Sequence, residues 1–240
     1  PMQSRVIFLE CSGISFQKTA PQAVDMTCGE LNGLVSSAEW TGVPLHYLLD
    51  EAGIKPSASW VIAEGADASG NNRSVPLSLA LQDTMIALYQ NGEPLRPAHG
   101  YPMRLLVPGC EGNLSIKWLR SLKLLVQAAH TREETSKYSD LMQNGIAGQF
   151  SLKMEVKSLI TSPSGKMKLP KQGIYEISGL AWSGMGAIRG VEVSADSGAT
   201  WSEAELQSEA GIYRAVRFRI PWRWNGQPAI LQSRASDSNG

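Results

Sequence analysis

The stretch Val216-Arg217-Phe218-Arg219-Ile220 alternates apolar side chains with guanidinium groups. Because successive side chains of a strand point to opposite faces, this pattern predicts a strand with one apolar and one charged face. Val191 and Val193 repeat the period, and Asp196-Ser197-Gly198 and Asn225-Gly226 are turn signals. Several short strands at such spacing predict a β-sandwich from about residue 150 onward.

The half of the chain before this region mixes strand-like and helix-like segments. Short apolar runs predict strands at 5–9, 60–63 and 103–107, the last closed by Pro108-Gly109. Helical spacing predicts a helix at 44–52 that stops at Gly53, and an early proline favours a helical turn at 76–81. This half is therefore expected to be α+β. A polar linker is expected at 141–149, so that residues 1–140 form the first domain and 141–240 the second.

The charge balance limits the possible functions. The 240 residues include 22 basic and 22 acidic side chains, and 18% of the chain is charged. Binding to nucleic acid or to a membrane surface needs clustered positive charge, so neither is expected. No apolar run approaches the roughly 18 residues of a transmembrane helix, and the first five residues lack the features of a secretory signal.

Cys11, Cys28 and Cys110 are too few and too widely spaced for a disulfide framework or a zinc site. Cys11 directly follows a predicted strand, in Glu10-Cys11-Ser12-Gly13, where its sulfur could point into a cleft. The alternative is a buried thiol at the end of a core strand, which we favour from Cys11 alone.

A glycine-rich segment carries basic side chains. It runs through His99-Gly100-Tyr101-Pro102-Met103-Arg104 and Pro108-Gly109-Cys110-Glu111-Gly112 to Lys117-Trp118. A guanidinium, an ammonium group and free backbone N–H groups are what a phosphate site needs. The alternative is a turn-rich loop with solvated charges, since the segment has neither a Walker motif nor GxGxxG.

Several motifs occur in a characteristic order. The first half contains Glu10-Cys11-Ser12-Gly13, Glu39-Trp40-Thr41-Gly42-Val43-Pro44-Leu45, Asn91-Gly92-Glu93-Pro94-Leu95-Arg96-Pro97, His99-Gly100-Tyr101-Pro102-Met103-Arg104 and Lys117-Trp118-Leu119. The second half contains Ala181-Trp182-Ser183-Gly184 and Phe218-Arg219-Ile220-Pro221-Trp222-Arg223-Trp224. Together they resemble the sulfite oxidase family of molybdopterin enzymes. The branch that looks closest is the molybdenum subunit of sulfane dehydrogenase of the bacterial sulfur-oxidising system.

This resemblance implies the fold and the site. The expected fold is an α+β, sulfite-oxidase-type molybdopterin domain, N-terminally incomplete, followed by an immunoglobulin-like β-sandwich dimerisation domain. By residue matching, Cys11 would bind molybdenum through its thiolate, and Tyr138 would line the substrate pocket as a catalytic residue. His99, Arg104 and Lys117 would hold the pterin and its phosphate.

The resemblance also implies an activity. A molybdenum–molybdopterin cofactor would oxidise a reduced sulfur compound by oxo transfer, with carrier-bound sulfane sulfur, a thiosulfate-derived species or sulfite as substrate. Because the chain has no Cys-x-x-Cys-His motif, no haem is expected on it, and a c-type cytochrome would accept the electrons. A sulfur-carrier protein as substrate, a homodimer through the second domain and a periplasmic location follow from the same resemblance.

Departures from the family pattern bear on the substrate. Ile14 stands in place of an asparagine, Phe16 lies where a pocket arginine is usual, and Met185 stands where another is common. Because charge-assisted bonds to an oxyanion would be lost, neutral or protein-bound sulfane sulfur fits better than sulfite. Relatives also carry a long portion before the cysteine. The alternative function is a cofactor-free binding or assembly module for a cytochrome or a sulfur carrier.

Overall fold

The computed structural model describes residues 2–13 and 26–240, which form two compact units. The first unit comprises Pro1–Leu9 and Ala38–Lys153, and the second comprises Glu10–Ser37 and Met154–Gly240. The segment 10–37, which the sequence placed in the first domain, thus packs with the C-terminal part of the chain. Ile14 and Phe16 lie outside the described residues.

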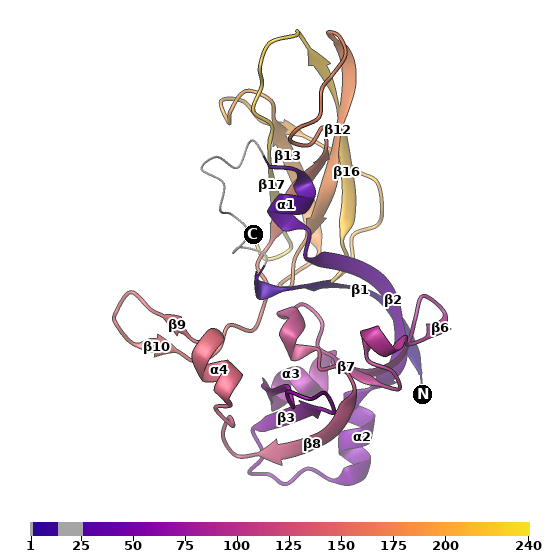
Figure 1. The fold of residues 1–240 in the computed structure, drawn as a ribbon, viewed down its shortest axis with the longest axis vertical. Coiled ribbons are helices and arrows are strands. Elements are labelled where there is room, and N and C mark those ends of the chain that lie inside the picture. The colour runs from indigo at the N-terminus through magenta and orange to yellow at the C-terminus, as the bar shows by residue number, and fades with distance from the viewer. Residues whose placement is uncertain (1, 14–25) are drawn as a thin grey trace. The chain divides into compact units, whose positions relative to one another are not determined.

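The first unit is built on two antiparallel sheets and short helices (Figure 1). One sheet has the order β1-β2-β5-β6, with β7 also paired to β5, and the other has the order β4-β3-β8. The strands are β1 (Gln3–Glu10), β2 (Val35–Pro44), β3 (Trp60–Gly65), β4 (Asn72–Pro76), β5 (Met85–Gln90), β6 (Glu93–Pro94), β7 (Arg104–Leu106) and β8 (Leu119–Leu125). The helices are α2 (Leu45–Ala52), α3 (Leu77–Gln82), α4 (Arg132–Lys137), η3 (Pro97–His99) and η4 (Gly112–Leu114).

The local patterns explain these elements. Helix α2 begins after Pro44 and ends at Gly53, whose φ of 78° is a conformation that glycine adopts at low cost. Leu45 and Leu49, one helical turn apart, are buried in the core of the unit together with Val61 and Leu105 from the two sheets. The strands predicted at 5–9, 60–63 and 103–107 and the helices predicted at 44–52 and 76–81 are all confirmed, to within a few residues at their ends.

The expected linker at 141–149 is wrong as a description of local structure. Strands β9 (Asp140–Leu141) and β10 (Ala147–Gly148) pair there as a small antiparallel hairpin. Asn144-Gly145 forms its turn, and Gly145 has a φ of 78°. The dipeptide is a hairpin signal that the polar composition of the segment obscured.

The second unit is a β-sandwich. Its sheets have the orders β11-β12-β16-β15 and β14-β13-β17. The elements are α1 (Cys28–Asn32), β11 (Lys157–Ser162), β12 (Gly173–Trp182), β13 (Ile188–Ser194), β14 (Ser202–Glu203), β15 (Glu205–Leu206), β16 (Val216–Trp224) and β17 (Gln232–Asp237). Strands β12 and β16 run side by side over their full length (Figure 1).

The alternating pattern of β16 places its apolar side chains as expected. Val216 and Phe218 are fully buried in the core, where they pack with Val191 and Val193 of β13. Arg217 is exposed, and Arg219 pairs with Glu205 of β15. The predicted fold class, an α+β unit followed by a sandwich, is confirmed.

Candidate active site

Arg104 is the centre of the basic segment in the first unit. It lies at the start of the buried strand β7 and is only 5% exposed. Its Nη1 donates to the carbonyl oxygen of His99 at 3.1 Å and its Nη2 to that of Ser115 at 2.9 Å. Among the described residues its Nε has no partner, so a buried donor of this cation is left unused.

Lys117 lies beside this guanidinium. Its Nζ donates to the carbonyl oxygen of Ala98 at 2.8 Å. A Cβ at Gly100 would stand 3.1 Å from the Cα of Lys117 and 3.2 Å from the Cβ of Arg104, so the glycine is what lets the loop lie this close. His99, which precedes it at the end of η3, is exposed.

The electrostatics of this group favour an anion. Burial lowers the pKa of Arg104 to about 10. Burial, and then the charge of Arg104, lowers the pKa of Lys117 below its ordinary value. In the described part of the chain both cations bond to carbonyl oxygens and neither is paired with a carboxylate. A phosphate would supply the missing negative charge and an acceptor for the unused donor.

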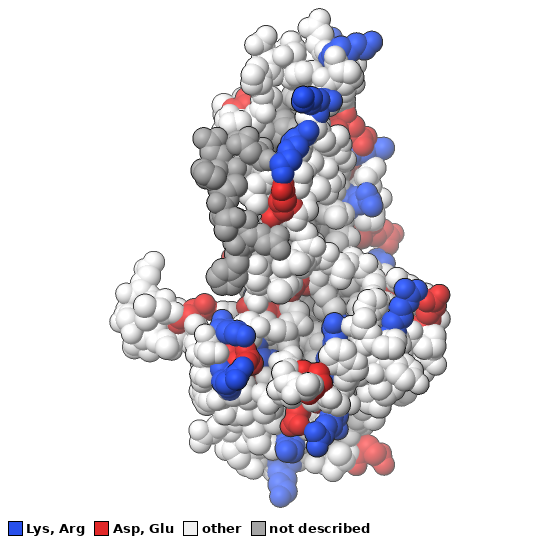
Figure 2. Space-filling view, viewed as in Figure 1, with Lys and Arg blue, Asp and Glu red and all other residues white. Residues whose placement is uncertain are grey.

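This positive charge is local. Figure 2 shows lysines and arginines scattered among aspartates and glutamates, without a broad field of either sign over the described residues of the face in view. On that face the described lysines and arginines therefore form no extended basic surface. No described helix is both long enough and apolar enough to cross a membrane.

Cys11 belongs to the second unit and is exposed. Its backbone N–H donates to the carbonyl oxygen of Leu34 at 3.0 Å. The preceding Glu10 is fully buried, and its carboxylate accepts from the Nε1 of Trp182 at 2.7 Å and from the Nζ of Lys157 at 2.5 Å. These bonds of Glu10 fix the end of β1. The next residue in the chain, Cys11, therefore presents an accessible thiol beside an anchored position. Such a thiol can serve as a soft metal ligand.

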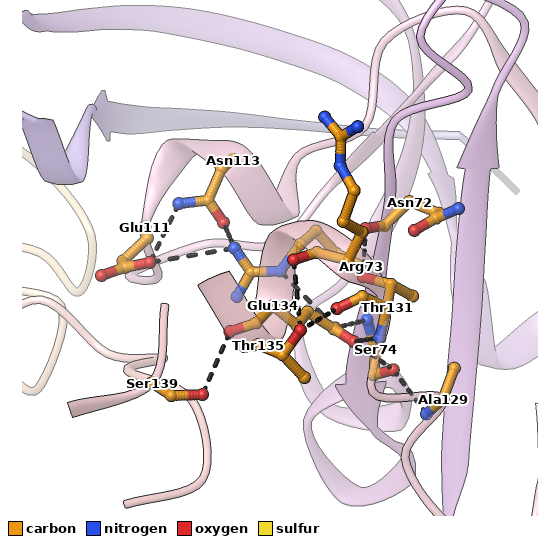
Figure 3. A network of polar contacts seen from close by, with 11 residues as sticks. Asn72, Arg73, Ser74, Glu111, Asn113, Ala129, Thr131, Glu134, Thr135 and Ser139 are labelled. Atoms are coloured by element: carbon orange, nitrogen blue, oxygen red, sulfur yellow. Dashed lines mark hydrogen bonds and ion pairs between the residues drawn. The ribbon is translucent and has the colours of Figure 1, made fainter. Parts of the chain in front are cut away.

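Tyr138 lies in another part of the first unit, directly after α4, and is half-buried. The guanidinium carbon of Arg73 is 4.1 Å from the centroid of its ring. Arg73 is fully buried on β4 and forms an ion pair with Glu134 of α4, with 3.6 Å between Nε and Oε1. Figure 3 shows the polar network around this pair.

The structure therefore brings His99, Arg104 and Lys117 together, and places Tyr138 in a second cluster with Arg73 and Glu134. The assigned roles of these residues and of Cys11 stay predictions. No sequence pattern assigned a role to Glu10, Arg73 or Glu134. Only Glu134 carried a readable signal, because Thr131-x-x-Glu134 is a capping box, a pattern that favours an orderly helix start.

Two family models match the chain. A model described as oxidoreductase molybdopterin binding domain matches residues 1–133, and one described as Mo-co oxidoreductase dimerisation domain matches residues 149–227. The two matches together span both halves of the molecule.

Known proteins match along much of the same length. Mitochondrial sulfite oxidase of Mus musculus is 31% identical over 210 residues, covering 80% of this chain and 37% of that protein. Inducible nitrate reductase [NADH] 1 of Glycine max is 31% identical over 218 residues, covering 77% and 24%. The crystal structure of the sulfane dehydrogenase SoxCD from Paracoccus pantotrophus is 44% identical with a TM-score of 0.93, covering all of this chain and 62% of that one. The chain thus spans well under half the length of the sulfite oxidase and the nitrate reductase.

Proposed function

Because the chain belongs to the family of molybdopterin-binding oxidoreductases, with the binding domain followed by the dimerisation domain, we propose that it oxidises reduced sulfur. The substrate we propose is sulfane sulfur held on a carrier protein. The similarity to a sulfane dehydrogenase at 44% identity supports this class over sulfite. Met185, at a position where family members commonly carry arginine, supports it as well, because an oxyanion would lose a charged partner there.

The observation that carries the proposal is the pair of cations, Arg104 and Lys117, that bond to carbonyl oxygens and lack a carboxylate in the described part of the chain. A buried guanidinium beside a half-buried ammonium group is costly unless a bound anion compensates the positive charge. The phosphate of a pterin cofactor has the charge and the acceptors to do so. These residues therefore fit the molybdopterin that the family binds.

Each proposed residue has a separate task. Cys11 would hold the metal through its thiolate, while Arg104, Lys117 and His99 would hold the pterin and its phosphate. The molybdenum cofactor, when bound, supplies two-electron redox chemistry with oxygen transfer. Tyr138 would donate a hydrogen bond from its hydroxyl group to the substrate and orient it.

The stoichiometry of the proposed oxidation requires a source of oxygen and an acceptor for electrons. Each oxygen added to the sulfur comes from water and releases two protons and two electrons. We propose that a c-type cytochrome accepts the electrons one at a time, and that the location is periplasmic, as the sequence resemblance implies. The dimerisation domain supports a homodimer through the second unit.

Metal and pterin analysis tests this function. Protein purified from a host that makes molybdopterin should contain about one molybdenum per chain, and Cys11→Ser should lose the metal. Cys28→Ser is the matched control, because Cys28 is half-buried at the start of α1 and has no proposed role. Lys117→Gln should lower pterin content, whereas Lys123→Gln, an exposed lysine of β8, should not.

Two outcomes would contradict the proposal. Molybdenum below about a tenth of an atom per chain, in folded protein from that host, would favour a cofactor-free binding module. Loaded protein that reduces cytochrome c with sulfite but not with a protein-bound persulfide would reject the proposed substrate.

A further inference from the structure

We propose that Arg73 is a positioning residue that holds the ring of Tyr138 in place, an inference that rests on the proposed role of Tyr138 at the substrate. The guanidinium of Arg73 lies 4.1 Å from the ring centroid. A cation over an aromatic face is attracted by the ring quadrupole, and the attraction is strongest where water is excluded. Arg73 is fully buried, so water is excluded from the cation, while the ring of Tyr138 is half-buried.

Arg73 is held by a polar network of its own. Its Nη1 donates to Oδ1 of Asn113 and lies 4.0 Å from the carboxylate of Glu111, while its Nε faces Glu134 at 3.6 Å (Figure 3). Asn113 is in turn held by its own bond to Glu111 at 2.9 Å. The guanidinium is thus held by one hydrogen bond and by the charges of two carboxylates, while Nε and Nη2 have no hydrogen-bond partner among the described residues.

Two of the groups that contact Arg73, Glu134 and Tyr138, come from one helix and its C-terminal end. Glu134 and Tyr138 are four residues apart, at α4 and directly after it, so they lie on the same side. The carboxylate of Glu134 also accepts from the backbone N–H of Thr131 at 2.9 Å and from the hydroxyl of Ser74 at 3.2 Å. The helix is thereby attached to β4, and the ring that follows it is set over the cation.

In the described part of the chain, Tyr138 is hydrogen-bonded to its neighbours through its backbone. Its N–H donates to the carbonyl oxygen of Glu134 at 3.3 Å, and its own carbonyl oxygen accepts from Ser151 at 3.0 Å. Within the described residues its hydroxyl makes no hydrogen bond and the ring is half-exposed. The ring orientation therefore depends on Arg73, and the hydroxyl stays available to a substrate.

A role in stability alone explains the cluster less well. Burial lowers the pKa of Arg73 below its ordinary value even though Glu134 and Glu111 favour the charged form. Nη2 of Arg73 has no hydrogen-bond partner among the described residues. An apolar side chain would fill such a site without these costs. Positioning the ring of Tyr138 requires the cationic guanidinium of Arg73, which accounts for a charged residue at this buried site.

A double-substitution cycle tests the proposal. In the loaded enzyme, Arg73→Met should lower kcat/KM about tenfold, mainly through KM, because the ring is no longer fixed. In a Tyr138→Ala background the same substitution should have little further effect, since Arg73 acts through the ring. Arg73→Lys, which keeps the charge but loses the plane, should fall between Arg73→Met and the parent. Arg132→Met, an exposed arginine on the same helix, is the control.

A spectroscopic readout makes the test independent of activity. With 3-fluorotyrosine at position 138, the ¹⁹F signal of Arg73→Met should move toward that of the free amino acid, and that of Arg132→Met should not. If Arg73→Met does not fold, Arg73→Lys and Glu134→Gln should each move the signal part of the way. An unmoved signal in these folded variants, or additive losses of kcat/KM in the cycle, would overturn the proposal. An inactive enzyme whose signal still moves would reject the proposed function and leave the positioning intact.

Discussion

Burial separates the chemistry of Cys110 from that of Cys11. Cys110 is 1% exposed in the core of the first unit, and burial raises the pKa of its thiol to about 12, whereas Cys11 is exposed. The thiolate is the nucleophile, so native protein at about pH 8.5 should alkylate at Cys11 and not at Cys110. Peptide mass spectrometry after iodoacetamide treatment measures this, with urea-unfolded protein as the control in which Cys110 also reacts.

The same shift gives a pH dependence of stability. The ordinary pKa of the thiol, 9.0, applies in the unfolded chain and the raised value in the fold. The stabilisation is therefore complete below about pH 9 and declines as the pH rises toward about 12. Cys110→Ala should lack this decline in denaturant unfolding curves. Equal alkylation rates at Cys11 and Cys110 in native protein would contradict the argument.

At the residue scale, Cys11, Arg104 and Lys117 could be singled out from the sequence because a thiol after a strand and cations beside glycines are residue types that suit a metal or a phosphate. Their roles stay predictions. Arg73 and Glu10 could not be singled out, because a charged residue within a strand normally faces solvent. Both are buried with ion-pair partners that are distant in the sequence, Glu134 and Lys157. Pairing over such separations is a tertiary effect.

At the element scale, strand β12 shows how closely the sandwich is packed. A Cβ at Gly179 would lie 2.2 Å from the carbonyl oxygen of Leu159 and 2.3 Å from Cζ of Phe218. Gly179→Ala should therefore lower the free energy of unfolding by about 1–3 kcal/mol, since neighbouring backbone must shift. Gly173, on the same strand, is the control, because its nearest neighbour is 4.0 Å away. Chemical denaturation of both variants measures the difference, and equal stabilities would contradict it.

Helices and strands were the part of the structure that the sequence predicted best. The alternation in 216–220 and the helical spacing in 44–52 are local properties, and both survived in the fold because each agrees with the burial that tertiary packing imposes. The hairpin at β9 and β10 was missed because its strands have two residues each, too short for a periodic signal.

For the whole molecule, the domain order and the family resemblance read from the motifs are confirmed. The family and the domain order were predictable because the motifs occur in both halves of the sequence and each belongs to a separate part of the fold. No local sequence pattern indicated that segment 10–37 belongs to the second unit. Which segments pack together is decided by the sum of many contacts.

The proposed homodimer gives a prediction at the same scale. In sedimentation equilibrium the purified protein should have about twice the 26.0 kDa mass of one chain. A dilution series provides the control, because a genuine association shifts toward the single-chain mass when diluted below its dissociation constant. A mass of one chain at all concentrations would contradict the dimer.

The interleaving of the two units has a consequence for how such a protein can be divided. Neither unit is a continuous stretch of chain, since residues 10–37 interrupt the first and complete the second. A gene cut at the apparent border would leave Glu10 without Lys157 and Trp182, and so would release the anchor beside Cys11. The two halves of the gene can therefore not be exchanged or expressed separately without loss. Recombination, truncation or separate expression of either half would damage the loop that carries Cys11, the candidate metal ligand.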